Sequence, residues 1–241
     1  MPRCWPKMAV LRKPLAAFIL AAVLSACTPQ LERPPAVAGH PPGNFPEQFY
    51  AQAILRHQPV FRIDPARSLV VIEARRGGSL ARVGHDHVVA SHDVQGYVAP
   101  DAGRADLYVE LDRLVVDEQP LRTEAGFDTH PSQEDIDGTR TNMLKVLQAE
   151  RYPFALVGAT RADAGSGDSK MNVSVTLHGM SRVYPVPLKV DASAEEVQVT
   201  GRLVLNQTDF GIVPLSILGG AVQVQDEVRM RFEIRARRVE R

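Results

Sequence analysis

Cysteine is nearly absent from this chain: its 241 residues include only Cys4 and Cys27, both near the N-terminus. The rest of the chain can form no disulfide, so its stability must come from a packed core and hydrogen bonds. An excess of one charge is also lacking, because 28 basic and 28 acidic residues balance. Nucleic-acid binding needs a basic patch or a high pI, and nothing in the composition indicates such a partner.

Long hydrophobic runs are scarce as well. The apolar run at residues 15–23 is too short to span a bilayer, and it follows four basic residues and no acid, which is typical of a secretory signal peptide. Residues 24–27, Leu-Ser-Ala-Cys, resemble the bacterial lipobox. In such signals the cysteine is acylated and the chain is cut before it, so we expect residues 1–26 to be removed and Cys27 to become the lipidated N-terminus. An ordinary signal peptide with a chance cysteine is the alternative.

The residue after the lipobox bears on location. Thr28 stands where an aspartate would signal retention at the inner membrane in many Gram-negative bacteria. The resemblance therefore predicts a protein of the bacterial cell envelope, lipid-anchored and facing the periplasm, at the outer rather than the inner membrane. Two or three acyl chains hold a protein on a membrane far more firmly than one.

The remaining 215 residues suffice for one domain. Residues 27–58 form the predicted linker, because six prolines lie within residues 28–48, and residues 47–58 can form one short helix. Residues 59–241 form the predicted domain, which carries most of the alternating apolar and polar positions.

Alternation with a period of two is typical of half-buried strands. About eight such segments are visible, with one or two short helices, chiefly within residues 131–150. Few helices and long strands favour a closed antiparallel β-barrel over a sandwich. The apolar face of these strands includes Val70, Ile72, Leu107, Val109, Val173, Val175, Leu203, Met230 and Phe232.

Five segments resemble elements of the YceI-like family of bacterial periplasmic proteins. They are FRIDPARSLVVIEARR (61–76), YPFALVGATRA (152–162), VTLHGMSRVYPVPLKV (175–190), LVLNQTDFGI (203–212) and VQDEVRMRFEIRA (224–236), in the family's order. The resemblance implies a lipocalin-like barrel of about eight strands around an elongated apolar cavity. It also implies binding of a polyisoprenoid or another long-chain amphiphile, for storage, shielding or transfer. The nine apolar residues above are the candidate ligand-binding side chains. The alternative is a structural module in which the same residues fill a solid core.

Three histidines are the other candidate site. His85 and His87 lie two residues apart and point to one face of an extended strand, and His92 follows five residues later. Imidazole groups bind Zn²⁺ or Cu²⁺, so a metal-binding or metal-dependent protein using these three is a second hypothesis. We prefer a role for His85 and His87 at the mouth of the barrel, hydrogen-bonded to a ligand headgroup.

Motifs for catalysis are missing: no G-x-S-x-G, P-loop, dinucleotide fingerprint or HExxH occurs. We therefore expect a binding protein rather than an enzyme, with no required cofactor. Its expected partners are a hydrophobic small molecule and, through the lipid anchor, a membrane; a homodimer is possible.

Overall fold

The computed structural model describes Met1, residues 41–161 and residues 170–240. Cys27, the signal peptide and most of the linker lie outside these described residues. The helices of the described part are α1 (Glu47–Leu55), α2 (Gln119–Glu124) and α3 (Gln133–Val146). No helix in this part of the chain is long and apolar enough to cross a membrane.

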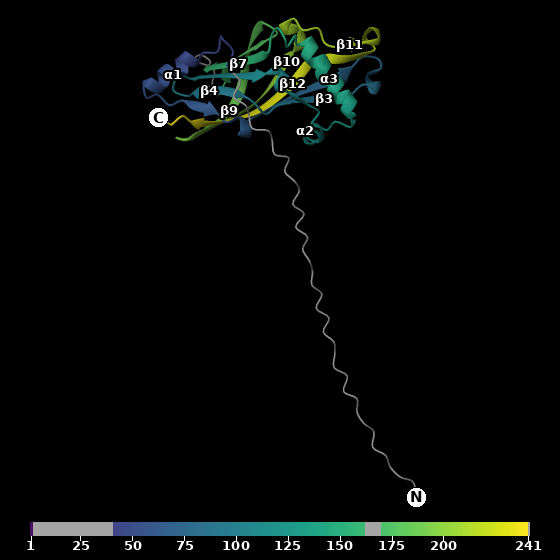
Figure 1. The fold of residues 1–241 in the computed structure, drawn as a ribbon, viewed down its shortest axis with the longest axis horizontal. Helices are drawn as coiled ribbons and strands as arrows, with labels where there is room; N and C mark the ends of the chain where they lie inside the picture. Colours follow the sequence, from purple (N-terminus) through teal and green to yellow (C-terminus); the bar gives the residue numbers. More distant parts are fainter. Residues whose placement is uncertain (2–40, 162–169, 241) are drawn as a thin grey trace. The chain divides into compact units, whose positions relative to one another are not determined.

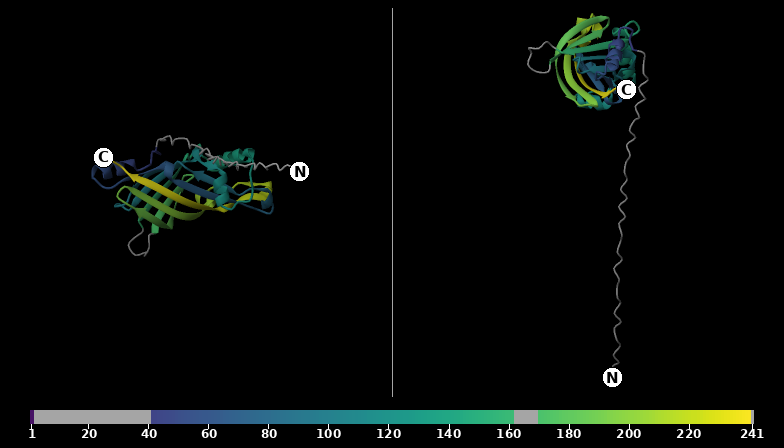
Figure 2. Two further views of the ribbon diagram at one scale, coloured as in Figure 1. Left: turned by 90° about the horizontal axis from the view of Figure 1, so that it is seen from below. Right: turned by 90° about the vertical axis from the view of Figure 1, so that its left-hand side faces the viewer.

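The strands close into an antiparallel barrel whose wall is eight strands in circumference, as the alternation predicted (Figures 1 and 2). The long C-terminal strand closes it, because it pairs with the N-terminal strands on one edge and with β10 (Glu196–Asn206) on the other. The strands are β1 (Phe61–Ile63), β2 (Leu69–Gly77), β3 (His87–Ser91), β4 (Gln95–Ala99), β5 (Arg104–Glu110), β6 (Val115–Val116), β7 (Phe154–Arg161), β8 (Lys170–Leu177), β9 (Met180–Ala192), β10 (Glu196–Asn206), β11 (Ser216–Ile217) and β12 (Val222–Arg238).

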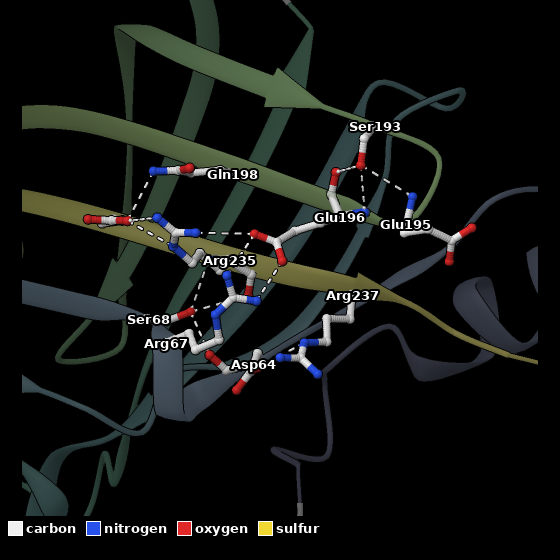
Figure 3. Close-up of polar contacts among 10 residues, drawn as sticks. Asp64, Arg67, Ser68, Ser193, Glu195, Glu196, Gln198, Arg235 and Arg237 are labelled. Carbon is white, nitrogen blue, oxygen red and sulfur yellow. Dashed lines mark hydrogen bonds and ion pairs between the residues drawn. The ribbon is translucent and has the colours of Figure 1, made fainter.

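β1 and β2 share one wall position because both pair with β12. A short 3₁₀ turn, η1 (Pro65–Arg67), separates them. At this break Ser68 is buried, and its hydroxyl bridges the carbonyl oxygens of Asp64 (2.8 Å) and Arg235 (3.3 Å) while accepting the N–H of Arg235. Figure 3 shows these contacts beside the ion pairs of Glu196 with Arg67 and Arg235. Ser68 thus satisfies backbone polar groups at the break between β1 and β2 along β12.

The interior of the barrel has two parts. At one end Phe210 and Ile212 are almost fully buried in a core that includes Val228 and Leu205. The apolar side chains of α3 pack against the same end. This end is therefore solid, whereas the other half of the barrel encloses a cavity.

Local sequence explains where the helices lie. α3 begins at a capping box, in which the Ser132 hydroxyl accepts the N–H of Asp135 and the Asp135 carboxylate accepts the N–H of Ser132. α1, within the predicted helical range, buries Tyr50 and Ala53 against β4. α2 was not predicted, so the described residues contain three helices instead of one or two; six residues beginning with Gln-Pro give too short a pattern to detect.

Candidate ligand-binding cavity

A cavity of about 710 Å³ lies inside the barrel. Small-molecule sites in proteins commonly measure about 300–1,000 Å³. Its wall comes from β4, β5, β7, β8, β9, β10, β12 and the start of β2, and most of the lining side chains are aliphatic. Such a wall excludes water and makes no directional demand on a ligand.

Eight of the nine predicted apolar residues line this cavity. They are Val70, Leu107, Val109, Val173, Val175, Leu203, Met230 and Phe232. The same alternation carries further lining residues that were not singled out, among them Val157, Leu188, Val197, Val199 and Ile234. The hollow interior also speaks against the hypothesis of a filled core.

Ile72 is the exception among the apolar predictions. It pairs with Met230 on β12 and with Val89 on β3, and it packs into the solid core beneath α3 instead of lining the cavity. Its face was predicted correctly, but its level along the barrel was not. Alternation predicts which face of a strand a residue lies on, but it does not predict the position of the residue along the barrel axis.

The open end lies beside the β4–β5 turn and the ends of β7 and β9, where Pro100, Arg161 and Ala192 line the cavity. Arg161 lies across this turn, because a methyl group on Gly103 would stand 3.2 Å from its Cβ. Arg104 and Lys170 are the other charged lining residues in the described part of the chain. The charged lining residues of the described chain are thus confined to the mouth, as a head-and-tail ligand requires.

The guanidinium of Arg104 is already hydrogen-bonded to another side chain of the protein. Its guanidinium donates two hydrogen bonds to Asp106, whose carboxylate also accepts the hydroxyl proton of Tyr50 at 2.6 Å. Burial and, after it, the neighbouring Asp106 raise the pKa of Tyr50 above its usual range. This network joins α1 to the barrel wall near the mouth.

The histidine prediction is wrong in position. His87 pairs with Ala74, which lies opposite Val228, so it stands at the solid end of the barrel. Neither His85 nor His87 lines the cavity, and the rings of these two residues lie 6.2 Å apart. They cannot contact a headgroup at the mouth, because the packed core separates them from it.

His87 has a protein partner instead. Its Nδ1 donates to the Asp117 carboxylate at 2.6 Å, while Asp117 also accepts the N–H of Val88 and a guanidinium N–H of Arg122. Burial alone would raise the pKa of Asp117, but these hydrogen bonds outweigh it and hold the pKa below its ordinary value. Arg122 is itself 1% exposed, and sequence reasoning did not detect this buried ion pair.

The three histidines do not assemble a metal site. His92 is separately bonded, through Nε2, to Glu118 at 2.6 Å. Among the residues that the structure describes, no group of three or more histidine, cysteine or acidic side chains is placed to hold a metal ion.

The model of the YceI-like domain matches residues 61–236. The chain belongs to the YceI-like family. No functionally curated protein matches it, so the solved structures provide the remaining comparisons.

Among solved structures, this YceI-like chain is similar to a polyisoprenoid-binding domain from Saccharophagus degradans implicated in plant cell wall breakdown. The two share 16% identity over 74% of this chain and 98% of that domain, with a TM-score of 0.53. BcnA from Burkholderia cenocepacia shares 18% identity over 72% of this chain and 99% of its own, with a TM-score of 0.45. The YceI protein of Campylobacter jejuni shares 15% over 61% and 82%, with a TM-score of 0.41. At these identities the first likeness shows the fold alone.

The YceI-like match begins after α1, yet α1 belongs to the barrel. The Tyr50 ring stacks on Tyr97 at 5.0 Å between centroids, and Phe49 lies under the guanidinium of Arg104. The predicted short helix at residues 47–58 thus corresponds to α1, which contributes residues that pack beside the cavity wall.

Proposed function

We propose that this chain is an envelope lipoprotein whose barrel binds a long-chain amphiphile and stores, shields or transfers it without changing it chemically. The observation that carries the proposal is the cavity of about 710 Å³ with a wall of aliphatic side chains and charge only at the mouth. A ligand with an apolar chain and a polar head matches that distribution.

An isoprenoid-like or fatty chain is the proposed cargo. Burying apolar surface contributes roughly 25 cal/mol per Å², so a long chain binds tightly with few polar contacts. Membership of the YceI-like family and the fold shared with a polyisoprenoid-binding domain support this choice. No cofactor is proposed.

Location in the envelope is proposed from the sequence. The signal-like residues 1–26 and the lipobox ending at Cys27 support a lipid anchor facing the periplasm, and Thr28 favours the outer membrane. A tethered carrier of this kind would hold an apolar molecule away from water close to the bilayer from which it came.

The test is native mass spectrometry of the chain from residue 28 onward, secreted to the periplasm without an affinity tag. Organic extraction and mass analysis of the extract follow. We expect a bound mass in the range of a polyprenyl or acyl compound, released by the solvent. A bare protein mass that stays unchanged after incubation with polyprenols, quinones and fatty acids would contradict the proposal.

A further inference from the structure

Exposed aliphatic side chains gather at the end of the barrel opposite the cavity mouth. In the described chain, Val213 is 79% exposed, Leu218 71%, Val83 62% and Ile217 53%. Leu215, at 36%, lies between them in sequence. We call Val83, Val213, Leu215, Ile217 and Leu218 the apolar tip. A contiguous exposed patch of this kind commonly marks an interaction surface.

Backbone contacts hold the tip together. Two segments form it: the 3₁₀ turn η2 (Ala81–Val83), and the stretch through β11 and the 3₁₀ turn η5 (Leu218–Gly220). The N–H of Leu80 donates to the carbonyl of Ala221 at 2.7 Å, and the N–H of Val224 donates to that of Leu215 at 2.9 Å. The tip is therefore part of the fold, built on the start of β12.

The conformation of Leu218 presents its side chain outward at an energetic cost. Its φ is +52°, in the left-handed region that a branched residue such as leucine seldom adopts. Gly219 and Gly220 follow, also at positive φ. A leucine in this conformation, 71% exposed, gains nothing from packing within the fold. Strain of this kind suggests a role for the side chain outside the folded chain.

Within the two segments that form the tip, the charged residues are basic. Residues 211–224 contain no charged residue, and residues 76–84 contain Arg76 and Arg82 without any acid. Arg76 is bound by Asp86 and Asp128, whereas Arg82 lies exposed beside Val83. Aliphatic side chains next to the exposed Arg82 suit the headgroup region of an anionic bilayer, where each basic residue adds to binding.

Figure 1 shows β11 at the end of the barrel away from α1 and the C-terminus. We propose that the apolar tip inserts into the headgroup region of an anionic lipid bilayer and so fixes how the barrel stands on the membrane. The mouth of the cavity then faces the aqueous phase. This inference does not depend on the identity of the cargo or on the lipid anchor.

Tryptophan fluorescence can report on the apolar tip alone, because the single tryptophan of the chain, Trp5, lies in the predicted signal peptide. Leu218→Trp in the chain from residue 28 therefore carries the only indole, and this chain keeps every described residue except Met1. We expect a blue-shifted emission on adding vesicles of phosphatidylethanolamine with phosphatidylglycerol, and quenching when the acyl chains are brominated. Val183→Trp is the matched control, since Val183 is 63% exposed on the barrel wall and its indole should not respond.

Two further variants test the source of the affinity. Replacing Ile217 and Leu218 with serine should weaken partition to these vesicles about tenfold or more, because two aliphatic side chains no longer enter the bilayer. Arg82→Gln should weaken it about fivefold and only for anionic vesicles. Equal responses of the indoles at 218 and 183 would overturn the proposal. So would a blue shift at position 218 that follows protein concentration without vesicles, which would identify a second copy of the chain as the partner.

Discussion

Gly201 and Phe232 face each other across the β10–β12 ladder, and the aromatic ring lies over the glycine backbone. A methyl group on Gly201 would stand 2.5 Å from Cζ of Phe232 and 2.7 Å from Cδ2 of Leu188. Both of these side chains line the cavity. The absence of a side chain at residue 201 therefore lets the ring lie flat against the wall and keeps the cavity open.

We predict that Gly201→Ala pushes the Phe232 ring into the cavity. Uptake of a fluorescent long-chain probe should fall, and the free energy of unfolding should drop by about 1–3 kcal/mol from overpacking. Gly138→Ala is the matched control, because a methyl group there meets nothing within 4 Å in α3. That change should leave uptake unaltered and raise the free energy of unfolding by roughly 0.5–1 kcal/mol. Similar losses of uptake in both variants would contradict this role of Gly201.

Val175 and Ser174 provide a second test of the cavity on one strand. Val175 is 5% exposed and lines the cavity, whereas Ser174 faces a groove on the outside of the barrel. Val175→Trp should abolish uptake of the long-chain probe by filling the cavity, with the circular dichroism spectrum retained. Ser174→Trp should bind the probe as the parent does. Unchanged uptake in Val175→Trp would place the ligand outside the barrel.

The sequence predicted the barrel and the faces of its strands because alternation depends only on neighbouring residues. The position of a residue along the barrel axis depends on how the strands are staggered in the closed barrel, and no local sequence pattern carries that information. Ile72 and Val70 are therefore indistinguishable in sequence, yet one lies in solid core and the other lines the cavity. The position of His87 at the solid end was missed for the same reason.

The buried pair of Asp117 and Arg122 shows a second limit. The two residues lie five apart in a polar segment, and their burial as a pair depends on how that segment packs against β3. The alternation pattern also could not predict whether the interior is hollow, because the same valines can either line a cavity or fill a core. The family resemblance, and not the composition, favoured the cavity.

Cys27 allows the proposed anchor to be tested directly. The full chain should incorporate labelled fatty acid and enter the detergent phase in Triton X-114 partition. Cys27→Ser should do neither, because the acylated thiol is lost. Cys4→Ser, within the predicted signal peptide, should behave as the parent. Incorporation of label into Cys27→Ser would show that the anchor, if any, lies elsewhere.

Asp117 should make the stability of the barrel depend on pH in the acid range. Its side chain is fully buried beside Arg122, which is 1% exposed, so Asp117→Asn leaves a guanidinium buried without its counter-charge. Removing one member of such a pair costs about 3–5 kcal/mol, and urea denaturation at neutral pH should show a loss of this size. Glu227→Gln, from the exposed pair with Arg229, should cost about 1 kcal/mol or less.

The sign of the pH dependence follows from the pKa of Asp117, which is lower in the folded protein than its ordinary value. The stabilisation by the carboxylate is complete above the unfolded pKa of about 3.9 and is lost as the pH falls through the lower, folded pKa. The difference in free energy of unfolding between the parent and Asp117→Asn is therefore compared from about pH 5 downward, the range in which Asp117 titrates. In that range it should shrink as the solution is acidified. A difference that grows below about pH 5 would mean that the carboxyl group is held protonated in the fold, against the hydrogen bonds it accepts from His87, Val88 and Arg122.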